Sequence, residues 1–577
     1  MKIQYFVFAL LILFSGARAQ VIDTNWLAKN YSKQEVMIAM RDGVKLFTAV
    51  YTPLDKSEKH PILMMRTPYS VAPYGKNRYS PRIYTTHWVE YLKEKYIIVM
   101  QDVRGRYMSE GDFVDVRPFV ENKKSKTDID EASDTYDAID WLVKNIPGNN
   151  ARVGVFGVSY PGFYSTMAAL SNHPALKAVS PQAPVTDWFM GDDFHHNGAF
   201  ALSDGFSFYY AFGKTRIKPT TKNENGFVFP ENDNYSFYLK QGALKNYNKY
   251  MKDSVKFWTD LMSHPDYDNW WKARDARRAC KDIQPAMLIV GGTFDAEDCF
   301  GAWNLYKAIE KQSPKTNNRL VMGPWFHGGW ARGEGANLGN VRFGQKNSPF
   351  YQKNIEVPFF NYYLKGSGDG VNIPEASVFF SGENNWWTLD SWPPKKTRSQ
   401  NIYLHAKQQL SFEKPGENTS FSKYTSDPAK PVPYTEDVHL NRTREYMSDD
   451  QRFAARRPDV LVFETAALKE DMILAGTVTA DLKVSLSTGD ADFVVKVIDV
   501  FPDNFKYDSA YCCKGVKNEV EMAGYQMLVR AEIMRGKYRN SFEKPEAFVP
   551  GKTEIVKFDL PDVAHTFKKG HKLMIQV

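Results

Sequence analysis

Short apolar runs alternate with helical patterns over the first third of the chain. Residues 62–65 and 96–100 have the length and composition of buried strands, and residues 136–143 carry apolar side chains at helical spacing. A third strand pattern covers 153–158, a helical pattern of small residues follows it, and another apolar run covers 178–185. Strands alternating with helices predict a mostly parallel, doubly wound sheet, whose ligand sites lie beyond the carboxyl ends of its strands.

The alternation of strand and helix patterns is interrupted twice along the chain. Residues 188–280 are rich in aromatic residues, Asn and Asp and contain helical stretches, which predicts a helical cap inserted into a sheet domain made of 20–187 and 281–370. After residue 370, short β runs at turn-rich intervals predict a β-sandwich, of jelly-roll type, over 371–577. The chain stops inside an apolar run, which we interpret as a truncation within this domain.

The N-terminus has the pattern of a targeting segment. Lys2 supplies a positive charge, residues 5–14 are apolar, and Ala17-Arg18-Ala19 offers a cleavage site for removal of a signal peptide over residues 1–19. The apolar run is too short to span a bilayer, and no other long apolar stretch follows it. We therefore expect an exported protein, periplasmic or extracellular, without a membrane span.

Composition narrows the function classes. With 577 residues the chain is too long for one core, so two or three domains are expected. The net charge of +7 is dispersed, which argues against a nucleic-acid partner. Cys280, Cys299, Cys512 and Cys513 show no zinc-ligand spacing and stay unassigned. Without a metal, nucleotide or flavin motif, we expect no cofactor.

The turn after the third strand carries the strongest chemical signal. Residues 157–162 read Gly-Val-Ser-Tyr-Pro-Gly between the strand and helix patterns. This is the context in which Ser159 would be held above a sheet as a nucleophile, with glycines permitting the strained turn. The usual spacing is Gly-x-Ser-x-Gly, and here the second glycine comes one residue late.

A nucleophilic serine needs a base and an acid that orients the base. In this architecture the order along the chain is Ser, then Asp or Glu, then His, each after a strand. Asp295 and His327 each follow a predicted strand closely, in that order. Glu297 and Asp298 compete with Asp295 for the role of the acid, and a histidine packed in a glycine-rich turn is the alternative for His327.

The reaction also needs donors for an oxyanion. The backbone N–H of Tyr160, directly after the serine, is one candidate. The phenol of Tyr69, in the loop after an early strand, is the other, although a tyrosine beside a proline more often only packs.

Several motifs together resemble the family of cocaine esterases and Xaa-Pro dipeptidyl-peptidases, which are serine hydrolases. The motifs are Arg66-Thr67-Pro68-Tyr69, Gln101-Asp102-Val103-Arg104-Gly105-Arg106, the late-glycine turn at 157–162, Phe294-Asp295 and Gly323-Pro324-Trp325-Phe326-His327. The resemblance implies an α/β-hydrolase fold with a helical cap and a C-terminal jelly roll. It also implies a triad of Ser159, Asp295 and His327, with Tyr69 and Tyr160 as oxyanion donors.

Within that family the chain is most similar to the α-amino-acid ester hydrolases. Their triad acid begins an Asp-x-Glu-Asp run, here residues 295–298, and a further Asp comes from the start of the cap. The resemblance implies that Glu297, Asp298 and Asp193 bind a substrate ammonium group, with Asp192 as the less favoured cap member. Crowded carboxylates repel one another, and an ammonium relieves that repulsion. The alternative is that Glu297 and Asp298 simply favour the start of a helix.

These inferences together predict an exported serine hydrolase that cleaves or transfers the acyl groups of α-amino-acid esters or amides, including β-lactam side chains. Its partner would be a small molecule with a free α-amino group, and the resemblance also suggests a homo-oligomer. An Xaa-Pro dipeptidyl-peptidase is one alternative. A glutaryl-7-ACA acylase is another, disfavoured because a glutaryl carboxylate would meet the acidic cluster. A noncatalytic carbohydrate-binding surface protein is the alternative from a different class.

Overall fold

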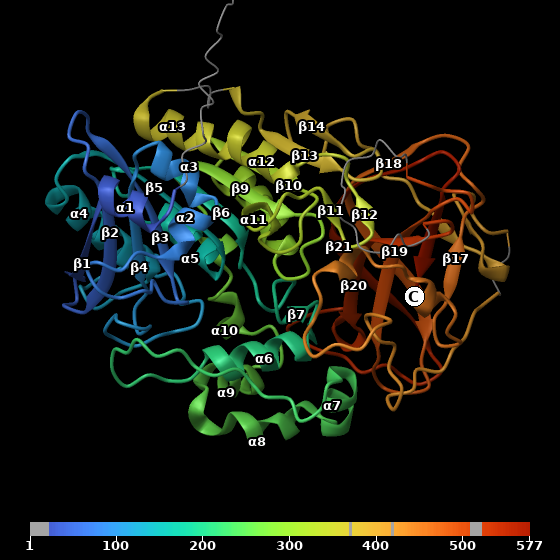
Figure 1. Cartoon of the computed structure of the whole chain (residues 1–577). Helices are drawn as coiled ribbons and strands as arrows, with labels where there is room; N and C mark the ends of the chain where they lie inside the picture. The colour runs from blue at the N-terminus through green and yellow to red at the C-terminus, as the bar shows by residue number, and fades with distance from the viewer. Residues whose placement is uncertain (1–21, 368–371, 417–419, 508–521) are drawn as a thin grey trace, which may run out of the picture.

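A ten-stranded, mostly parallel sheet forms the centre of the computed structural model, which describes residues 22–367, 372–416, 420–507 and 522–577 (Figure 1). The strand order is β1-β2-β4-β3-β5-β6-β9-β10-β13-β14. Neighbours from β4 to β13 run parallel, whereas β1, β2 and β14 form antiparallel edges. The strands are β1 Tyr31–Ala39, β2 Lys45–Pro53, β3 His60–Thr67, β4 Ile97–Asp102, β5 Asn149–Ser159, β6 Leu176–Pro184, β9 Ala286–Gly292, β10 Asn318–Gly323, β13 Ala376–Phe380 and β14 Asn385–Leu389. The predicted doubly wound sheet is confirmed.

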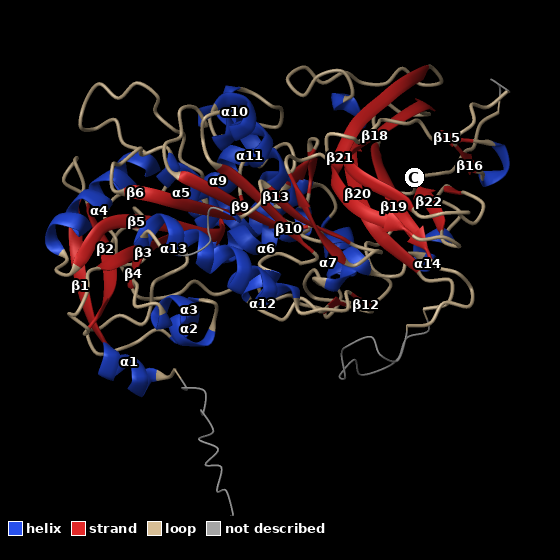
Figure 2. Ribbon diagram, turned by 90° about the horizontal axis from the view of Figure 1, so that it is seen from above, coloured by secondary structure: helices blue, strands red, loops and turns tan. Residues whose placement is uncertain are grey.

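Helices cover both faces of this sheet (Figure 2). Side chains of α4, α5 and α11 share one hydrophobic core with the sheet, and those of α3 and α13 share the other. Every residue of β4 and of β9 is buried, as expected for strands covered on both sides. The helices of this domain are α1 Thr24–Asn30, α2 Pro81–Thr85, α3 Trp88–Lys93, α4 Glu131–Asn145, α5 Tyr160–Ala169, α11 Cys299–Gln312, α12 Asn347–Tyr351 and α13 Val357–Lys365.

The helices predicted between β6 and β9 are present and form a cap at the bottom of Figure 1. A cluster of aromatic rings holds them together; Phe206, for example, packs edge-on against both Tyr247 and Trp258. The cap elements are the short strands β7 His195–His196 and β8 Ala199–Phe200 and the helices α6 Leu202–Phe212, α7 Asn234–Gln241, α8 Asn248–Met251, α9 Lys256–Ser263 and α10 Asn269–Lys272.

The C-terminal part is a β domain, at the right of Figure 1. Its described strands form a four-stranded sheet, β17-β22-β19-β20, and a long antiparallel pair, β18-β21. The jelly-roll topology stays a prediction. The short strands β11 Asn337–Leu338 and β12 Val341–Arg342 precede β13 and pair with each other. The bounds in the C-terminal part are β15 Tyr403–Leu404, β16 Leu410–Ser411, α14 Arg452–Ala455, β17 Val462–Glu464, β18 Met472–Ser485, β19 Asp492–Val500, β20 Gln526–Arg535, β21 Thr553–Phe567 and β22 Lys572–Gln576.

One strand lies in a different sheet from the one expected. Residues 378–380 form a strand, as predicted, but their assignment to the C-terminal β domain is wrong. The strand β13 pairs in parallel with β10, and β14 pairs with β13, so the large sheet continues past residue 370. Short β runs on either side of a domain boundary carry no signal of which sheet they join, because that depends on long-range pairing.

Some predicted features fall outside the described residues. The signal peptide over 1–19 and the pair Cys512 and Cys513 belong to this group. Cys280 and Cys299 are buried free thiols. Within the described ranges, no helix has both the length and the apolar character needed to cross a membrane.

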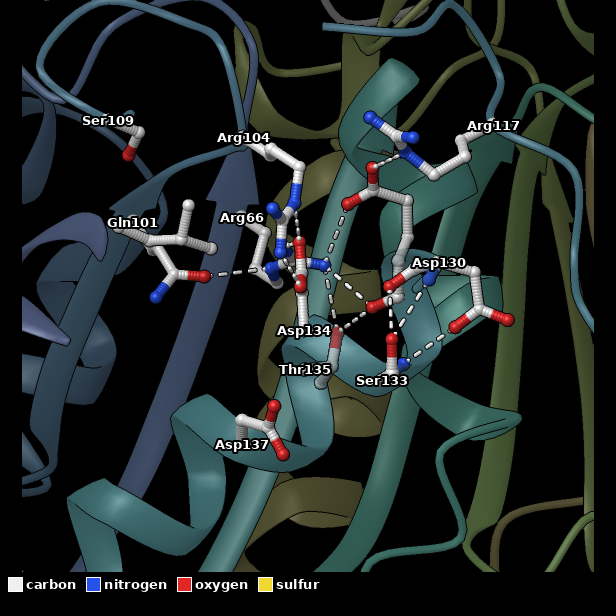
Figure 3. Close-up of polar contacts among 12 residues, drawn as sticks. Arg66, Gln101, Arg104, Ser109, Arg117, Asp130, Ser133, Asp134, Thr135 and Asp137 are labelled. Carbon is white, nitrogen blue, oxygen red and sulfur yellow. Dashed lines mark hydrogen bonds and ion pairs between the residues drawn. The ribbon is translucent and has the colours of Figure 1, made fainter. Parts of the chain in front are cut away.

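A buried ion network fixes α4 against the ends of β3 and β4 (Figure 3). The Arg104 guanidinium binds both carboxylate oxygens of Asp134, at 2.7 and 3.0 Å. Arg66 reaches the Glu131 carboxylate at 3.1 Å and that of Asp134 at 3.8 Å. The two acids lie in the first turn of α4, where they also favour the helix dipole. Arg66 lies near the end of β3, and Arg104 lies two residues after β4, so the network attaches α4 to the carboxyl ends of both strands.

We expect the Asp134→Asn variant to lower the free energy of unfolding by about 2–3 kcal/mol, because it removes one of the two carboxylates that bind the buried Arg104 and leaves only Asp42. The matched control is Asp137→Asn on the same helix, whose partner Arg41 is 28% exposed; it should cost about 1 kcal/mol or less. Urea unfolding followed by tryptophan fluorescence measures both. Equal, small losses would contradict a structural role for the network.

Candidate active site

The turn at Ser159 is strained in the way the sequence predicts. Ser159 ends β5 and has φ 72° and ψ −129°, an uncommon conformation for a residue with a side chain. A Cβ on Gly157 would stand 2.4 Å from the Pro161 carbonyl oxygen, so only glycine fits there. A Cβ on Gly162 would stand 2.6 Å from the Gln182 carbonyl oxygen. The late glycine therefore lets α5 approach β6 closely.

The loops after β9 and β10 bring the predicted acid and base together. The Asp295 carboxylate and His327 Nδ1 are 2.9 Å apart, and both side chains are buried. Asp298 is 3.8 Å from the same nitrogen. Asp295 is thus the acid best placed to orient the ring. The His327 loop also packs on the strand that carries the serine, because a Cβ on Gly328 would lie 3.4 Å from a Val158 methyl group.

The other ring nitrogen faces a carboxylate. His327 Nε2 lies 3.2 Å from Glu297 Oε2. The hydrogen bonds among the described residues do not include one between the Ser159 hydroxyl and this ring. Burial alone would lower the pKa of His327, but Asp295 and Glu297 outweigh it and raise the pKa to about 9. The imidazole is therefore protonated at neutral pH in this state, and its Nε2 is directed at Glu297.

Two groups can donate to an oxyanion near Ser159. The backbone N–H of Tyr160 is the first of α5, and such groups have no partner within the helix. The Tyr160 phenol is tied away from the site, since it donates to Asp115 at 3.2 Å and accepts from the Val116 N–H at 2.7 Å. Only the backbone N–H of Tyr160 is therefore available to an oxyanion, and its phenol is not.

Tyr69 lies under the cap with its ring between aromatic neighbours. It packs edge-on against Tyr160 and Phe208. Arg106 holds the preceding residue, because its Nε donates to the Pro68 carbonyl at 3.1 Å. Burial, followed by the fields of Asp193, Asp298 and Glu297, raises the pKa of Tyr69 well above its usual value. The phenol is therefore neutral and keeps its proton to donate.

The three predicted cluster acids come together beside the ring of His327. The Asp193 N–H donates to the Glu297 carbonyl at 2.9 Å, and the Asp193 carboxylate accepts from Trp188 at 2.7 Å. Asp298 is fully buried, and neither of its carboxylate oxygens has a hydrogen-bond partner. Burial and then the neighbouring acids raise the pKa of Asp298 well above its usual value and that of Asp193 to about 7. A buried acid without a hydrogen-bond partner, beside two other acids, suits a cation.

Asp192 has a different role from Asp193. Its carboxylate accepts the N–H groups of Thr186, Asp187 and Gly301 and the Thr186 hydroxyl. With every strong acceptor position used, Asp192 fixes the start of the cap and leaves Asp193 for the cluster.

The sequence did not reveal two charged residues of the site. Arg442, from the segment between β16 and β17, donates to Glu297 Oε1 at 2.5 Å and to both oxygens of Asp204 at 3.0 Å. These residues and Asp193 line a pocket of about 340 Å³ together with the rings of Phe208 and Tyr238. No local motif marks Arg442, which lies 145 residues from Glu297.

Comparison with known proteins relates the whole chain to one family. The pattern of the family described as X-Pro dipeptidyl-peptidase (S15 family) matches residues 42–329, and that of the X-Pro dipeptidyl-peptidase C-terminal non-catalytic domain matches 360–577. The cocaine esterase of Rhodococcus sp. (strain MB1 Bresler) is 28% identical over 95% of this chain and 91% of its own length.

Two solved structures resemble the chain along nearly its full length. A crystal structure of an aminopeptidase from the marine sediment archaeon Thaumarchaeota archaeon has a TM-score of 0.86 and 36% identity, over 98% of this chain and 92% of that one. An α-amino acid ester hydrolase has a TM-score of 0.86 and 34% identity, over 99% of this chain and 92% of that one.

The contact between Glu297 and His327 can be tested by titration. In protein labelled with ¹⁵N-histidine we expect the His327 ring, identified by its loss in His327→Asn, to titrate near pH 9. Glu297→Gln should move the midpoint down toward the ordinary value of about 6.5, because a carboxylate that stabilises the imidazolium is gone. A wild-type midpoint at or below the ordinary value would show that the acids do not control the ring.

Proposed function

Because the chain belongs to the X-Pro dipeptidyl-peptidase (S15) family, whose members include esterases and dipeptidyl-peptidases, we propose that it is a serine hydrolase acting on acyl donors with a free α-amino group. The observation that carries this proposal is the fully buried carboxylate of Asp298, whose oxygens have no hydrogen-bond partner, beside Asp193 and Glu297 and next to the His327–Asp295 pair.

In the proposed reaction the Ser159 hydroxyl attacks the ester or amide carbonyl carbon. His327 Nε2 takes the hydroxyl proton and returns it to the leaving group, while Asp295 holds Nδ1. The Tyr160 N–H and the Tyr69 phenol stabilise the negative oxygen of the tetrahedral intermediate. Water or an amine then attacks the acyl-enzyme and gives hydrolysis or acyl transfer.

The substrate ammonium has two effects in this scheme. It replaces the mutual repulsion of the acids by attraction, so that protons held by Asp193 and Asp298 are released on binding. It also competes with His327 for Glu297, whose carboxylate lies 3.2 Å from Nε2 in the unliganded arrangement. Binding of a substrate with an amino group thereby frees the base that the serine needs.

The same acids argue against a glutaryl donor, because its free carboxylate would enter a site that already holds Asp193, Glu297 and Asp298. Dipeptides with a free N-terminus keep the required ammonium. Rates on an amino-acid ester, a cephalexin-type β-lactam, a Gly-Pro anilide and a glutaryl amide rank the candidates directly. We also propose, from the N-terminal sequence pattern, that the enzyme is exported.

We expect Ser159→Ala to lower turnover of phenylglycine methyl ester by at least about 10³-fold, since the nucleophile is lost while binding remains. Labelling of the wild type, but not of the variant, by a fluorophosphonate probe provides the matching chemical readout. Wild-type turnover by the variant would rule out Ser159 as the nucleophile. A wild type with neither turnover nor labelling would instead favour a noncatalytic carbohydrate-binding role.

Asp298→Asn tests ammonium recognition. For phenylglycine methyl ester we expect a loss of about 2 kcal/mol or more in transition-state stabilisation, roughly 30-fold in kcat/KM, because a buried charge partner is removed. Phenylacetate methyl ester lacks only the amino group, and its kcat/KM should change far less. Equal losses on the two esters would show that this cluster does not bind the ammonium, without contradicting the proposed triad.

A further inference from the structure

Arg442 brings a cation of the protein itself to the acidic site. Its Nε lies 3.0 Å from each oxygen of Asp204, and its Nη2 lies 2.5 Å from Glu297 Oε1. The side chain is 14% exposed, so the pair is largely desolvated. Burial by itself would lower the pKa of Arg442, but Asp204 and Glu297 outweigh it and keep the guanidinium charged.

The segment that carries Arg442 is attached to the cap. The Pro431 carbonyl accepts from the Tyr235 hydroxyl at 2.7 Å, and the His439 carbonyl accepts from the Asn234 N–H at 3.0 Å. Both partners lie in the first turn of α7. The guanidinium is thus held on a segment fixed at two points, and it is not a freely moving surface side chain.

The two carboxylates differ in what else they contact. Glu297 has its second oxygen on His327, whereas Asp204 has both oxygens on Arg442. Asp193 and Asp298 make no contact with Arg442. Asp204 is therefore fully engaged by Arg442, whereas Glu297 is shared: its Oε1 is held by Arg442, and its Oε2 is the oxygen for which His327 and a substrate ammonium compete.

Arg442 and the two acids that it contacts face the pocket. Arg442, Asp204 and Glu297 line the 340 Å³ pocket together with Phe208 and Tyr238, and Asp193 lies at the pocket as the member shared with the ammonium site. Phe208 also packs against the ring of Tyr69, which connects the pocket to the proposed oxyanion site. With the ammonium at Asp193, Glu297 and Asp298, as proposed above, this pocket is the adjoining space that can receive the side chain of the acyl group.

We infer that Arg442 is a specificity-determining residue that makes this pocket accept neutral acyl side chains and reject cationic ones such as lysyl. This inference rests on the proposed function, because it concerns the side chain of the same α-amino acyl donor. A lysyl ammonium in the pocket would meet the guanidinium, and the two acids that would otherwise attract it are already paired. Without Arg442, both oxygens of Asp204 and Oε1 of Glu297 would face the pocket without a cation.

The test compares norleucine methyl ester with lysine methyl ester, which share the α-amino group and a four-carbon side chain and differ in the terminal ammonium. We expect the wild type to prefer the norleucine ester. In Arg442→Gln the ratio of the two kcat/KM values should move toward the lysine ester by roughly tenfold or more, since like charge is replaced by opposite charge. Arg442→Lys, which keeps the cation, should retain the wild-type preference.

The matched control is Arg444→Gln. It removes a positive charge from the same segment, at a side chain that stacks on Phe326 and does not contact Glu297. Its ratio should equal that of the wild type. An Arg442→Gln ratio that is unchanged, or moved equally by Arg444→Gln, would overturn the inference.

A measurement on the wild type covers the case in which Arg442→Gln does not fold. Norleucinamide should inhibit the wild type at a lower concentration than lysinamide, and the reverse order would contradict the inference. If the proposed hydrolase function itself is wrong, the result differs from a failure of this inference, because neither amino ester would be cleaved in a Ser159-dependent way.

Discussion

The carboxylate of Asp295 joins the two halves of the site. One of its oxygens accepts from His327 Nδ1, and the other accepts the N–H groups of Glu297 and Asp298. A single buried side chain thus orients the imidazole and fixes the backbone that carries two acids of the cluster. Burial tends to raise the pKa of Asp295, but the adjacent imidazolium lowers it, so the carboxylate stays ionised. The imidazole of His327 and the backbone of the acidic cluster are therefore coupled, because both are attached to this carboxylate.

Electrostatics in the unliganded site favour a resting arrangement. Acidic neighbours keep the His327 ring protonated, and its Nε2 is directed at Glu297 instead of the serine. Catalytic hydrogen bonds are often incomplete without substrate. Here the incomplete contact has an identifiable cause, a carboxylate that a substrate ammonium can draw away. Under the proposed function, the acids that recognise the substrate ammonium are also those that keep His327 protonated.

The C-terminal β domain takes part in the site although it lies beside the large sheet. Arg442 reaches Glu297 from the segment before β17, and Arg530 of β20 donates to the sulfur of Cys299, the first residue of α11. Lys307 of the same helix pairs with Asp562 of β21 at 2.7 Å. The helix that follows the acidic cluster is therefore held from the far side by the β domain. The two domains form one functional unit at this point.

The sequence by itself determined the alternating strand–helix order, the strained serine turn and the positions of Asp295 and His327. These features depend on local pattern, on glycines whose Cβ atoms would collide, and on chain order. The separate roles of Asp192 and Asp193 needed the tertiary structure, since adjacent acids look alike until their hydrogen-bond donors are known. The same holds for strand β13, which joins the large sheet, and for Arg442. Their contacts are made between residues far apart in the chain, where burial and pairing, and not local pattern, decide the energy.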